Sequence, residues 1–383
     1  MPNHELHLAR NVRVSAPAAS VRPRALLAIL IRGPRVRIFL CVVGSAALLS
    51  ACGGHATIAA TTTTLPSRTP TPDMRAGPAV QSATLSPLTG LPQSNVTQAS
   101  APAVVVKIDN VDPALPQSGI DQADIVYEEM VESGLTRLAA VFQSQYPTVV
   151  GPVRSGRLTD EGIADDLNYP VFAYSGSNGD FLPILRSQPV TDADDGNQPG
   201  QFWRVNFEVA PHNLYTNVAD LATLPTAPTP PPLLFSFLSQ GQQFTGAGAA
   251  PISQVNIPFP SASVTWTWNA AQGAWLRTQD GTADVVRDGP QLSAQNVIVQ
   301  FVPYVVSSMA DESGVLVDIP TGELVGNGVA WFLSQGQLVK GSWERGSLTA
   351  QTVYTDMNGV AVGLTPGRTW VELVPVGTAP TAG

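Results

Sequence analysis

Basic side chains are scarce in this chain, so the places where they gather point to a candidate binding site. The segment VGPVRSGR surrounds Arg154 and Arg157 with glycine and proline, which is typical of a loop. The planar guanidinium groups of arginine suit the oxygens of carboxylates and phosphates. We expect these arginines either to form one anion site or to pair singly with the many acidic residues nearby. Six basic residues lie in the first half of the predicted folded part: Lys107, Arg137, Arg154, Arg157, Arg186 and Arg204.

A predicted β-hairpin places carboxylates beside one of these arginines. The runs DIVYEEMVE and LTRLAAVFQ flank the dipeptide Ser-Gly at 133–134, which favours a two-residue turn. With this turn, Glu128 lies opposite Ala139, and Glu128, Glu132 and Arg137 share one face because side chains alternate along a strand. This acid-base-acid ladder predicts either the floor of a ligand-binding cleft or a solvent-exposed ion pair that contributes little to stability.

Three further polar residues are candidates for contact with a ligand. His212 and Asn213 belong to the motif PHNLY, a polar tip that opens a predicted helix, and Tyr174 belongs to the motif FAYSG. A single histidine is more often structural than functional, so both roles of His212 stay open. The acidic run 192–197 departs from the spacing of a calcium loop. We therefore expect no metal site and no cofactor, and no residue is identified as catalytic.

The composition excludes several classes of protein. The chain has 383 residues, a formal net charge of -9, 44% hydrophobic and 13% charged residues, and 2 cysteines. These values differ from those of a small disulfide scaffold, a polytopic membrane protein, a collagen-like chain or a basic nucleic-acid-binding protein. We expect no nucleic-acid partner. Motifs for a phosphate-binding loop, a zinc protease or a nucleophile elbow are absent from the predicted folded part.

The amino terminus predicts export and lipid anchoring. Residues 1–37 carry seven arginines, and the apolar run from Ile38 to Leu49 that follows is too short to span a bilayer. This run ends in LSACGG, which resembles the bacterial lipobox, where cleavage before the cysteine leaves that cysteine acylated. We predict a signal peptide over 1–51 and lipidation, palmitate included, at Cys52. The mature protein is then expected on the extracytoplasmic face of the cell membrane.

The rest of the chain predicts an α+β protein with two domains. Residues 52–85 begin with the lipidated cysteine and are rich in Thr, Ala, Ser and Pro, which predicts a disordered tether. Residues 86–225 mix strand and helix signals and predict a mixed α/β-type N-terminal domain. The proline-dense segment 226–245 predicts a linker. Residues 246–377 contain period-two apolar runs separated by turn signals, which predict a smaller, mostly antiparallel β domain.

The apolar pattern also places individual elements within the N-terminal domain. The runs 104–109 and 171–174 are apolar and β-branched, which predicts short strands. Helices are expected over 157–167, 177–187 and 213–224. The hairpin described above lies between the first of these strands and the first of these helices.

Seven motifs occur in order along the predicted folded part, namely SPLTGLP, KIDN, QSGIDQADIVYEEMVESGLTR, VGPVRSGR, FAYSG, PHNLY and PGRTWVELVP. Together they resemble the YerB-like lipoprotein family and cover nearly all of the mature folded chain. This family is chiefly known as one of unknown function. The resemblance implies an amino-terminal α/β-type domain and a smaller carboxy-terminal domain, with acidic residues at positions 128 and 132.

Three functions are compatible with these features. The first is an exported lipoprotein that binds an anionic or cell-wall partner, or an envelope protein, through an Arg/Glu-lined cleft. The second is a phosphotransferase or hydrolase acting on lipid-linked pyrophosphate, because ADIVYE, VVGPVRSGR and FAYSGSN are similar in order to segments of LytR-type phosphotransferases. Those enzymes have an Arg-Asp pair where this chain has Arg154-Ser155. The third is a structural scaffold for envelope assembly. We predict the first, with ligand contacts from Glu128, Glu132, Arg137, Arg154, Arg157, Tyr174, Arg204, His212 and Asn213.

Overall fold

The structure is a computed structural model, and its described residues lie within residues 76–383. The predicted signal peptide (1–51), Cys52 and most of the predicted tether lie outside the described residues. Within the described part of the chain, no helix has the length and apolar character needed to cross a membrane. The structure describes residues 84–93, 95–177, 181–224, 229–310 and 316–383.

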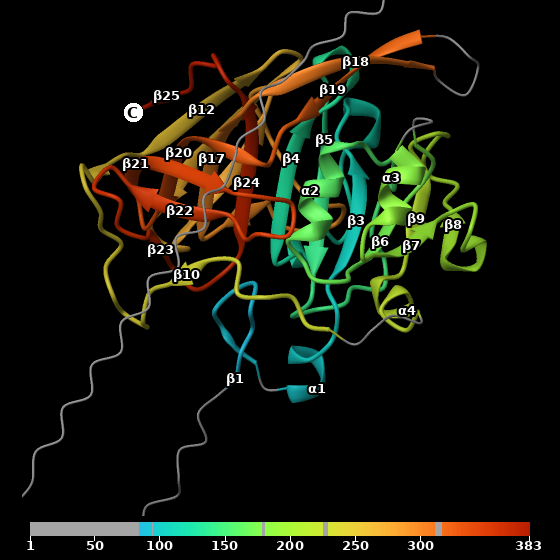
Figure 1. Ribbon diagram of the computed structural model, residues 1–383, viewed down its shortest axis with the longest axis horizontal. Coiled ribbons are helices and arrows are strands. Elements are labelled where there is room, and N and C mark those ends of the chain that lie inside the picture. Colours follow the sequence, from blue (N-terminus) through green and yellow to red (C-terminus); the bar gives the residue numbers. More distant parts are fainter. Residues whose placement is uncertain (1–83, 94, 178–180, 225–228, 311–315) are drawn as a thin grey trace, which may run out of the picture. The chain divides into compact units, whose positions relative to one another are not determined.

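A mixed β-sheet with 11 strands in the described residues runs through both predicted domains (Figure 1). The two halves meet where β24 (Thr369–Pro375) pairs in parallel with β4 (Ile125–Met130) on one side and with β17 (Asn296–Val302) on the other. The protein is therefore mostly β, and the predicted domain boundary does not divide its strands into separate sheets. The remaining strands of this sheet are β3 (Val104–Asp109), β5 (Thr136–Phe142), β6 (Val171–Tyr174), β7 (Thr191–Asp194), β11 (Ala250–Pro251), β20 (Gly326–Ser334), β21 (Gln337–Arg345) and β22 (Val353–Asp356).

A second sheet packs against one face of the large sheet, and it has six strands in the same described residues. Its Trp266 and Trp275 are fully buried in one core with Leu138 and Val297 of the large sheet. This sheet consists of β12 (Gln254–Phe259), β13 (Ala262–Asn269), β14 (Ala274–Gln279), β15 (Thr282–Ala283), β16 (Ser293–Ala294) and β25 (Thr381–Ala382). Two-stranded sheets are formed by β1 (Thr84–Leu85) with β2 (Pro92–Gln93), β8 (Phe202–Arg204) with β9 (Leu214–Thr216), β10 (Ser236–Phe237) with β23 (Gly363–Leu364), and β18 (Tyr304–Ala310) with β19 (Leu316–Gly322).

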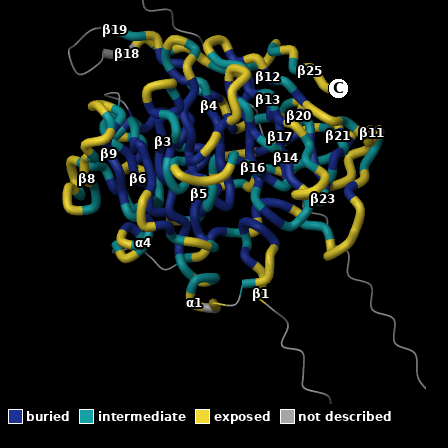
Figure 2. The backbone as a smooth tube through the Cα atoms, turned by 180° about the vertical axis from the view of Figure 1, so that it is seen from behind, coloured by how far each residue is buried: buried dark blue, intermediate teal, exposed yellow. Residues whose placement is uncertain are grey.

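Short helices cover part of the other face of the large sheet, in front of β3 to β6 in Figure 1. Ile163, Phe181 and Leu185 of these helices pack on Phe172 and Tyr127 in a second apolar core. β3, β4 and β5 contribute residues to both cores, and Figure 2 shows these strands in the dark blue of buried residues. The helical segments are α1 (Val96–Ala99), α2 (Thr159–Asp165), α3 (Phe181–Ser187), α4 (Val218–Leu221) and the 3₁₀ turns η1 (Asp112–Ala114), η2 (Ile120–Gln122), η3 (Glu132–Gly134) and η4 (Pro199–Gln201).

Several elements differ from the sequence predictions. The strands predicted at 104–109 and 171–174 are confirmed as β3 and β6. The helix predicted over 213–224 is wrong in its first part, because β9 pairs there with β8 and only α4 follows. The described part of the predicted linker packs against the protein, since Leu234 and Phe235 are buried.

The β4–β5 hairpin has a three-residue loop in place of the predicted two-residue turn. Ser133 and Gly134 both adopt left-handed backbone, with φ of 60° and 72°. The loop is closed by a hydrogen bond from the Val131 amide to the Leu135 carbonyl. A loop with one more residue shifts the pairing of every residue that follows it.

The altered register overturns the predicted acid-base-acid ladder. Glu128 lies opposite Leu138 and not Ala139, and Arg137 lies opposite Glu129. Because successive side chains point to opposite faces, Arg137 lies on the face away from Glu128. The two residues therefore do not share a cleft floor.

Candidate functional site

A cleft of about 390 Å³ lies where β3 ends, beside the loop between β4 and β5. Asp109, the last residue of β3, lines this cleft and was not selected from the sequence, although the motif KIDN ends the strand with it. A carboxylate at the end of an apolar strand was the signal that could have identified it. Five residues selected from the sequence also line the cleft: Glu132, Arg137, Arg154, Arg157 and His212.

Asp109 organises one side of the cleft. Its Oδ2 lies 2.9 Å from Nε of Arg154 and 2.7 Å from Nδ1 of His212. The loop that carries Arg154 is attached to β3, because the Arg154 amide donates to the Lys107 carbonyl and the Asp109 amide donates to the Pro152 carbonyl, both at 2.9 Å. Backbone pairing with a buried strand thus fixes the position of the Arg154 side chain.

Glu132 and Arg157 form a second ion pair in the cleft. Nη2 of Arg157 lies 2.6 Å from Oε1 of Glu132. Burial opposes ionisation of Glu132, but the positive charges of Arg157 and Arg137 outweigh it and hold the pKa of Glu132 below its ordinary value. Glu132 is therefore a carboxylate at neutral pH and neutralises part of the charge of the arginines.

Arg137 lies close to both ion pairs and has unused hydrogen-bonding capacity. Its side chain is buried, and its Nη1 donates to the Ser155 carbonyl at 3.2 Å. Among the described residues, no carboxylate forms an ion pair with Arg137, and Nε of the neighbouring Arg157 has no hydrogen-bond acceptor. Burial, and then the positive charge of Arg157, lowers the pKa of Arg137 to about 10, so its guanidinium remains charged at neutral pH.

The cleft carries a positive charge on an acidic protein. Three arginines face two carboxylates, which leaves one formal positive charge when His212 is neutral, whereas the whole chain has a net charge of -9. Arginine forks that are held in place and only partly used are suited to bind the oxygens of a carboxylate or a phosphate. The arrangement can therefore hold a small anionic group.

A buried charged group underlies the cleft and supports its loop. Nζ of Lys107 donates to Glu129 and, at 2.9 Å, to Oδ1 of Asp160 at the start of α2. The other oxygen of Asp160 accepts a hydrogen bond of 2.7 Å from the Arg157 amide. Burial, and then the negative charge of Asp160, raises the pKa of Glu129 to about 7 even though Lys107 opposes this effect. These contacts connect β3, β4, α2 and the loop that carries Arg154 and Arg157, here called the arginine loop.

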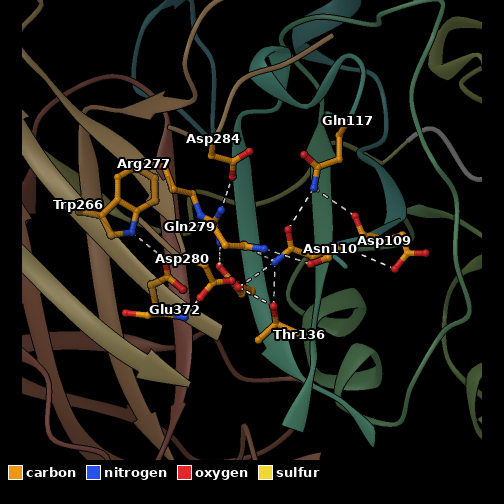
Figure 3. Close-up of polar contacts among 12 residues, drawn as sticks. Asp109, Asn110, Gln117, Thr136, Trp266, Arg277, Gln279, Asp280, Asp284 and Glu372 are labelled. Carbon is orange, nitrogen blue, oxygen red and sulfur yellow. Dashed lines mark hydrogen bonds and ion pairs between the residues drawn. The ribbon is translucent and has the colours of Figure 1, made fainter. Parts of the chain in front are cut away.

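Glu128 is not a cleft residue, which corrects the sequence prediction. It lies on the other face of β4 and accepts hydrogen bonds from Nη2 of Arg277 at 2.6 Å and from Oγ1 of Thr136 at 2.7 Å. Figure 3 shows Arg277 reaching from the second sheet toward Thr136 and Asn110. Arg277 also pairs with Asp284. Glu128 thus belongs to a buried network that joins the two halves of the chain.

Tyr174, Arg204 and Asn213 lie outside the residues that line the cleft. The Tyr174 hydroxyl donates to Asp192 at 2.8 Å, and Nη1 of Arg204 donates to Oδ1 of Asn213 at 2.7 Å. Nδ2 of Asn213 in turn donates to the Val205 carbonyl at 3.1 Å. Arg204 and Asn213 therefore fix the segment that carries His212, and their predicted contact with a ligand is not supported by this geometry.

The fold and the cleft define a mostly β protein whose mixed central sheet has an arginine-lined cleft where β3 ends. Residues 88–228 match the family model described as "Protein of unknown function (DUF3048) N-terminal domain". Residues 255–371 match the model for the C-terminal domain of the same family. The chain belongs to this family of unknown function, and the resemblance to YerB-like proteins is confirmed.

YerB of Bacillus subtilis is similar to most of this chain, both in sequence and in its solved structure. A protein of Bacillus subtilis (strain 168) named "Putative lipoprotein YerB" is 28% identical over 304 residues, which cover 76% of this chain and 86% of that protein. The crystal structure of the YerB protein from Bacillus subtilis is similar with a TM-score of 0.64 and 25% identity. That similarity covers 78% of this chain and 99% of the YerB chain, so nearly the whole YerB structure has a counterpart here.

Proposed function

We propose that this protein is an exported lipoprotein that binds an anionic group of a cell-wall polymer or an envelope protein in the arginine-lined cleft. Lipid on Cys52 anchors it to the extracytoplasmic face of the cell membrane. The anchor is supported by the LSACGG pattern and by the printed name of the Bacillus relative, which calls that protein a lipoprotein. The binding role is supported by the cleft itself.

Arg137 is the observation that carries the binding role. Burying a charged group whose hydrogen bonds are only partly made costs free energy, so folded proteins seldom keep such a group in a purely structural position. Arg137 is buried and has one backbone carbonyl as its acceptor, and its guanidinium faces a cleft. An anion in the cleft would supply the missing acceptors and offset the cost of burial.

Two neighbouring arginines fit the same role. Arg154 contacts Asp109 through Nε, which leaves its two terminal nitrogens for a ligand, and 26% of its side chain is exposed. Arg157 is held by Glu132 and by the Gly156 carbonyl, with Nε unused. Because these donors come from fixed loops, little side-chain entropy is lost when an anion binds.

The experiment is calorimetric titration of the full-length protein in detergent micelles with inorganic phosphate and, separately, with acetate. Saturable binding of at least one anion is expected, and the comparison tells phosphate from carboxylate recognition. Arg154→Ala should weaken binding at least tenfold, which corresponds to about 1.4 kcal/mol. Arg186→Ala is the matched control, because Arg186 is half exposed and pairs with Asp192 outside the cleft.

Two results would contradict this function. One is the absence of saturable binding of either anion by the unaltered protein. The other is an equal loss of affinity in Arg154→Ala and Arg186→Ala, which would mean that the anions respond to overall charge and not to the cleft.

A further inference from the structure

His212 and Asp109 form a pair that leaves one ring nitrogen available to the cleft. Nδ1 of His212 lies 2.7 Å from Oδ2 of Asp109. An ionised carboxylate can only accept a hydrogen bond, so Nδ1 carries the proton of this contact and Nε2 of the neutral ring has a free lone pair. His212 lines the cleft, and Nε2 has no hydrogen-bond partner among the described residues.

Asp109 is held firmly enough to fix the orientation of the ring. It is 1% exposed, and its Oδ1 accepts a hydrogen bond of 3.0 Å from the Asn110 amide. Arg154 contacts the same oxygen as His212, at 2.9 Å. The carboxylate therefore has a defined direction at the end of a buried strand, and it sets which nitrogen of His212 can accept a proton.

A base beside an anion site can act directly on the bound anion where that anion is itself the reacting centre. A carboxylate is a poor electrophile, whereas a phosphoryl group is an anion that arginines can bind and an electrophile that water can attack. Three terminal oxygens of a phosphate monoester also match the three guanidinium groups of Arg137, Arg154 and Arg157 better than the two oxygens of a carboxylate do.

We propose that the cleft hydrolyses a phosphate monoester, with His212 as the general base. This proposal rests on the anion site proposed above. Nε2 of His212 takes a proton from a water molecule, whose oxygen forms a bond to phosphorus while the ester P–O bond breaks. The electron pair of that bond leaves with the alkoxide oxygen, which then receives the proton from His212. The products are an alcohol and inorganic phosphate, and the ring returns to its neutral form.

The test uses the full-length protein in detergent micelles and p-nitrophenyl phosphate as the substrate. Turnover is measured as release of p-nitrophenolate, and affinity for inorganic phosphate is measured separately by calorimetry. His212→Asn is the informative variant, because its amide can still donate to Asp109 from nearly the position of Nδ1 but offers no base. It should lose about 100-fold or more in turnover, the usual range for a general base, and keep its phosphate affinity within about twofold.

A second variant separates catalysis from folding. His212→Ala should be inactive, and added imidazole should restore part of its turnover without raising its melting temperature. Arg186→Ala, which alters an exposed arginine outside the cleft, should turn over like the unaltered protein.

The outcomes distinguish the hydrolase proposal from the anion-binding proposal on which it rests. Phosphate binding without turnover above that of His212→Asn overturns the hydrolase and leaves the anion site standing. Absence of both binding and turnover overturns both. Full turnover in His212→Asn overturns the inference. It is also overturned if His212→Asn loses turnover only in proportion to a lower melting temperature, because His212 is then a structural residue.

Discussion

Glu372 of β24 lies directly beside Glu128 of β4 on neighbouring parallel strands, where the two halves of the chain share one sheet. Both residues are fully buried, and Glu372 accepts a hydrogen bond of 2.7 Å from the Trp266 indole while Arg277 binds Glu128. Burial, and then the negative charge of Glu128, raises the pKa of Glu372 well above its ordinary value. Glu372 therefore keeps its proton at pH values where an exposed glutamate has lost it.

The two glutamates should respond differently to the same substitution. Glu372→Gln replaces a neutral carboxyl group by a neutral amide of the same shape and should change the free energy of unfolding by less than about 1 kcal/mol. Glu128→Gln removes the negative charge that Arg277 faces and should cost at least about 2 kcal/mol. Urea unfolding at pH 7 measures both values. Equal losses in the two variants would show that the proton is not on Glu372.

The same carboxyl group should give the protein a pH-dependent stability. A raised pKa means that the folded state holds a proton that the unfolded state releases above about pH 4.5, so the contribution of Glu372 is lost as the pH rises from that value. The slope for one such group is at most about 1.4 kcal/mol per pH unit. Unfolding measured between pH 5 and pH 8 should show a shallower decline in Glu372→Gln, and parallel curves for the two proteins would count against this assignment.

Arg137→Met should weaken phosphate binding while it stabilises the fold. The substitution removes a buried charge that has no carboxylate partner in the described residues and leaves an apolar chain that can fill much of the space. We expect the free energy of unfolding to rise by about 1 kcal/mol and the affinity for phosphate to fall at least tenfold. Thermal unfolding and calorimetric titration measure the two effects. A less stable variant would identify Arg137 as a structural residue.

Gly134→Ala tests whether the hairpin loop positions the cleft. Gly134 has φ of 72°, and an added Cβ would lie 2.7 Å from Cβ of Pro260, so the loop and the adjacent Glu132 must move. A loss of about 1–3 kcal/mol in unfolding free energy is expected, with weaker phosphate binding. Gly273→Ala is the matched control, because Gly273 has φ of 61° and nothing within 4 Å of the added Cβ. The Gly273→Ala control should lose stability and keep its affinity for phosphate. An equal loss of phosphate affinity in both variants would show that the hairpin loop does not position the cleft.

Cys52→Ala tests the proposed anchor. Without the thiol, no acyl chain can be attached at this position, and the protein should appear in the soluble fraction after membranes are washed with carbonate. The unaltered protein should remain with the membranes under the same treatment. Retention of the variant in the membrane fraction would place the anchor elsewhere.

Local patterns in the sequence were sufficient to predict β3 and β6, because runs such as VVVKID are short, apolar and β-branched. They were insufficient to predict that β24 lies between β4 and β17, since more than two hundred residues separate β24 from β4 and no periodicity records such pairing. For this reason the sequence did not indicate that strands from both predicted domains share one sheet. Strand identity is a local property, whereas the neighbours of a strand in a sheet are set by packing.

For the candidate site, the arginine loop could be predicted and the hairpin register could not. A Ser-Gly dipeptide fits both a two-residue turn and the observed three-residue loop. The choice is made by contacts from the second sheet, because the Ser261 hydroxyl donates to the Ser133 carbonyl at 2.7 Å and the Ser261 amide donates to the Gly134 carbonyl at 3.2 Å. Those contacts join residues more than one hundred positions apart, so no sequence pattern near the turn predicts them.

The place of β24 also affects when the sheet can form. Residues 369–375 complete the pairing of β4, and more than two hundred residues separate them from β4 along the chain. Until β24 is in place, β4 lacks its parallel neighbour and the two halves of the sheet cannot join. Because this pairing is non-local, the central sheet can be completed only after its local hairpins have formed, which slows folding.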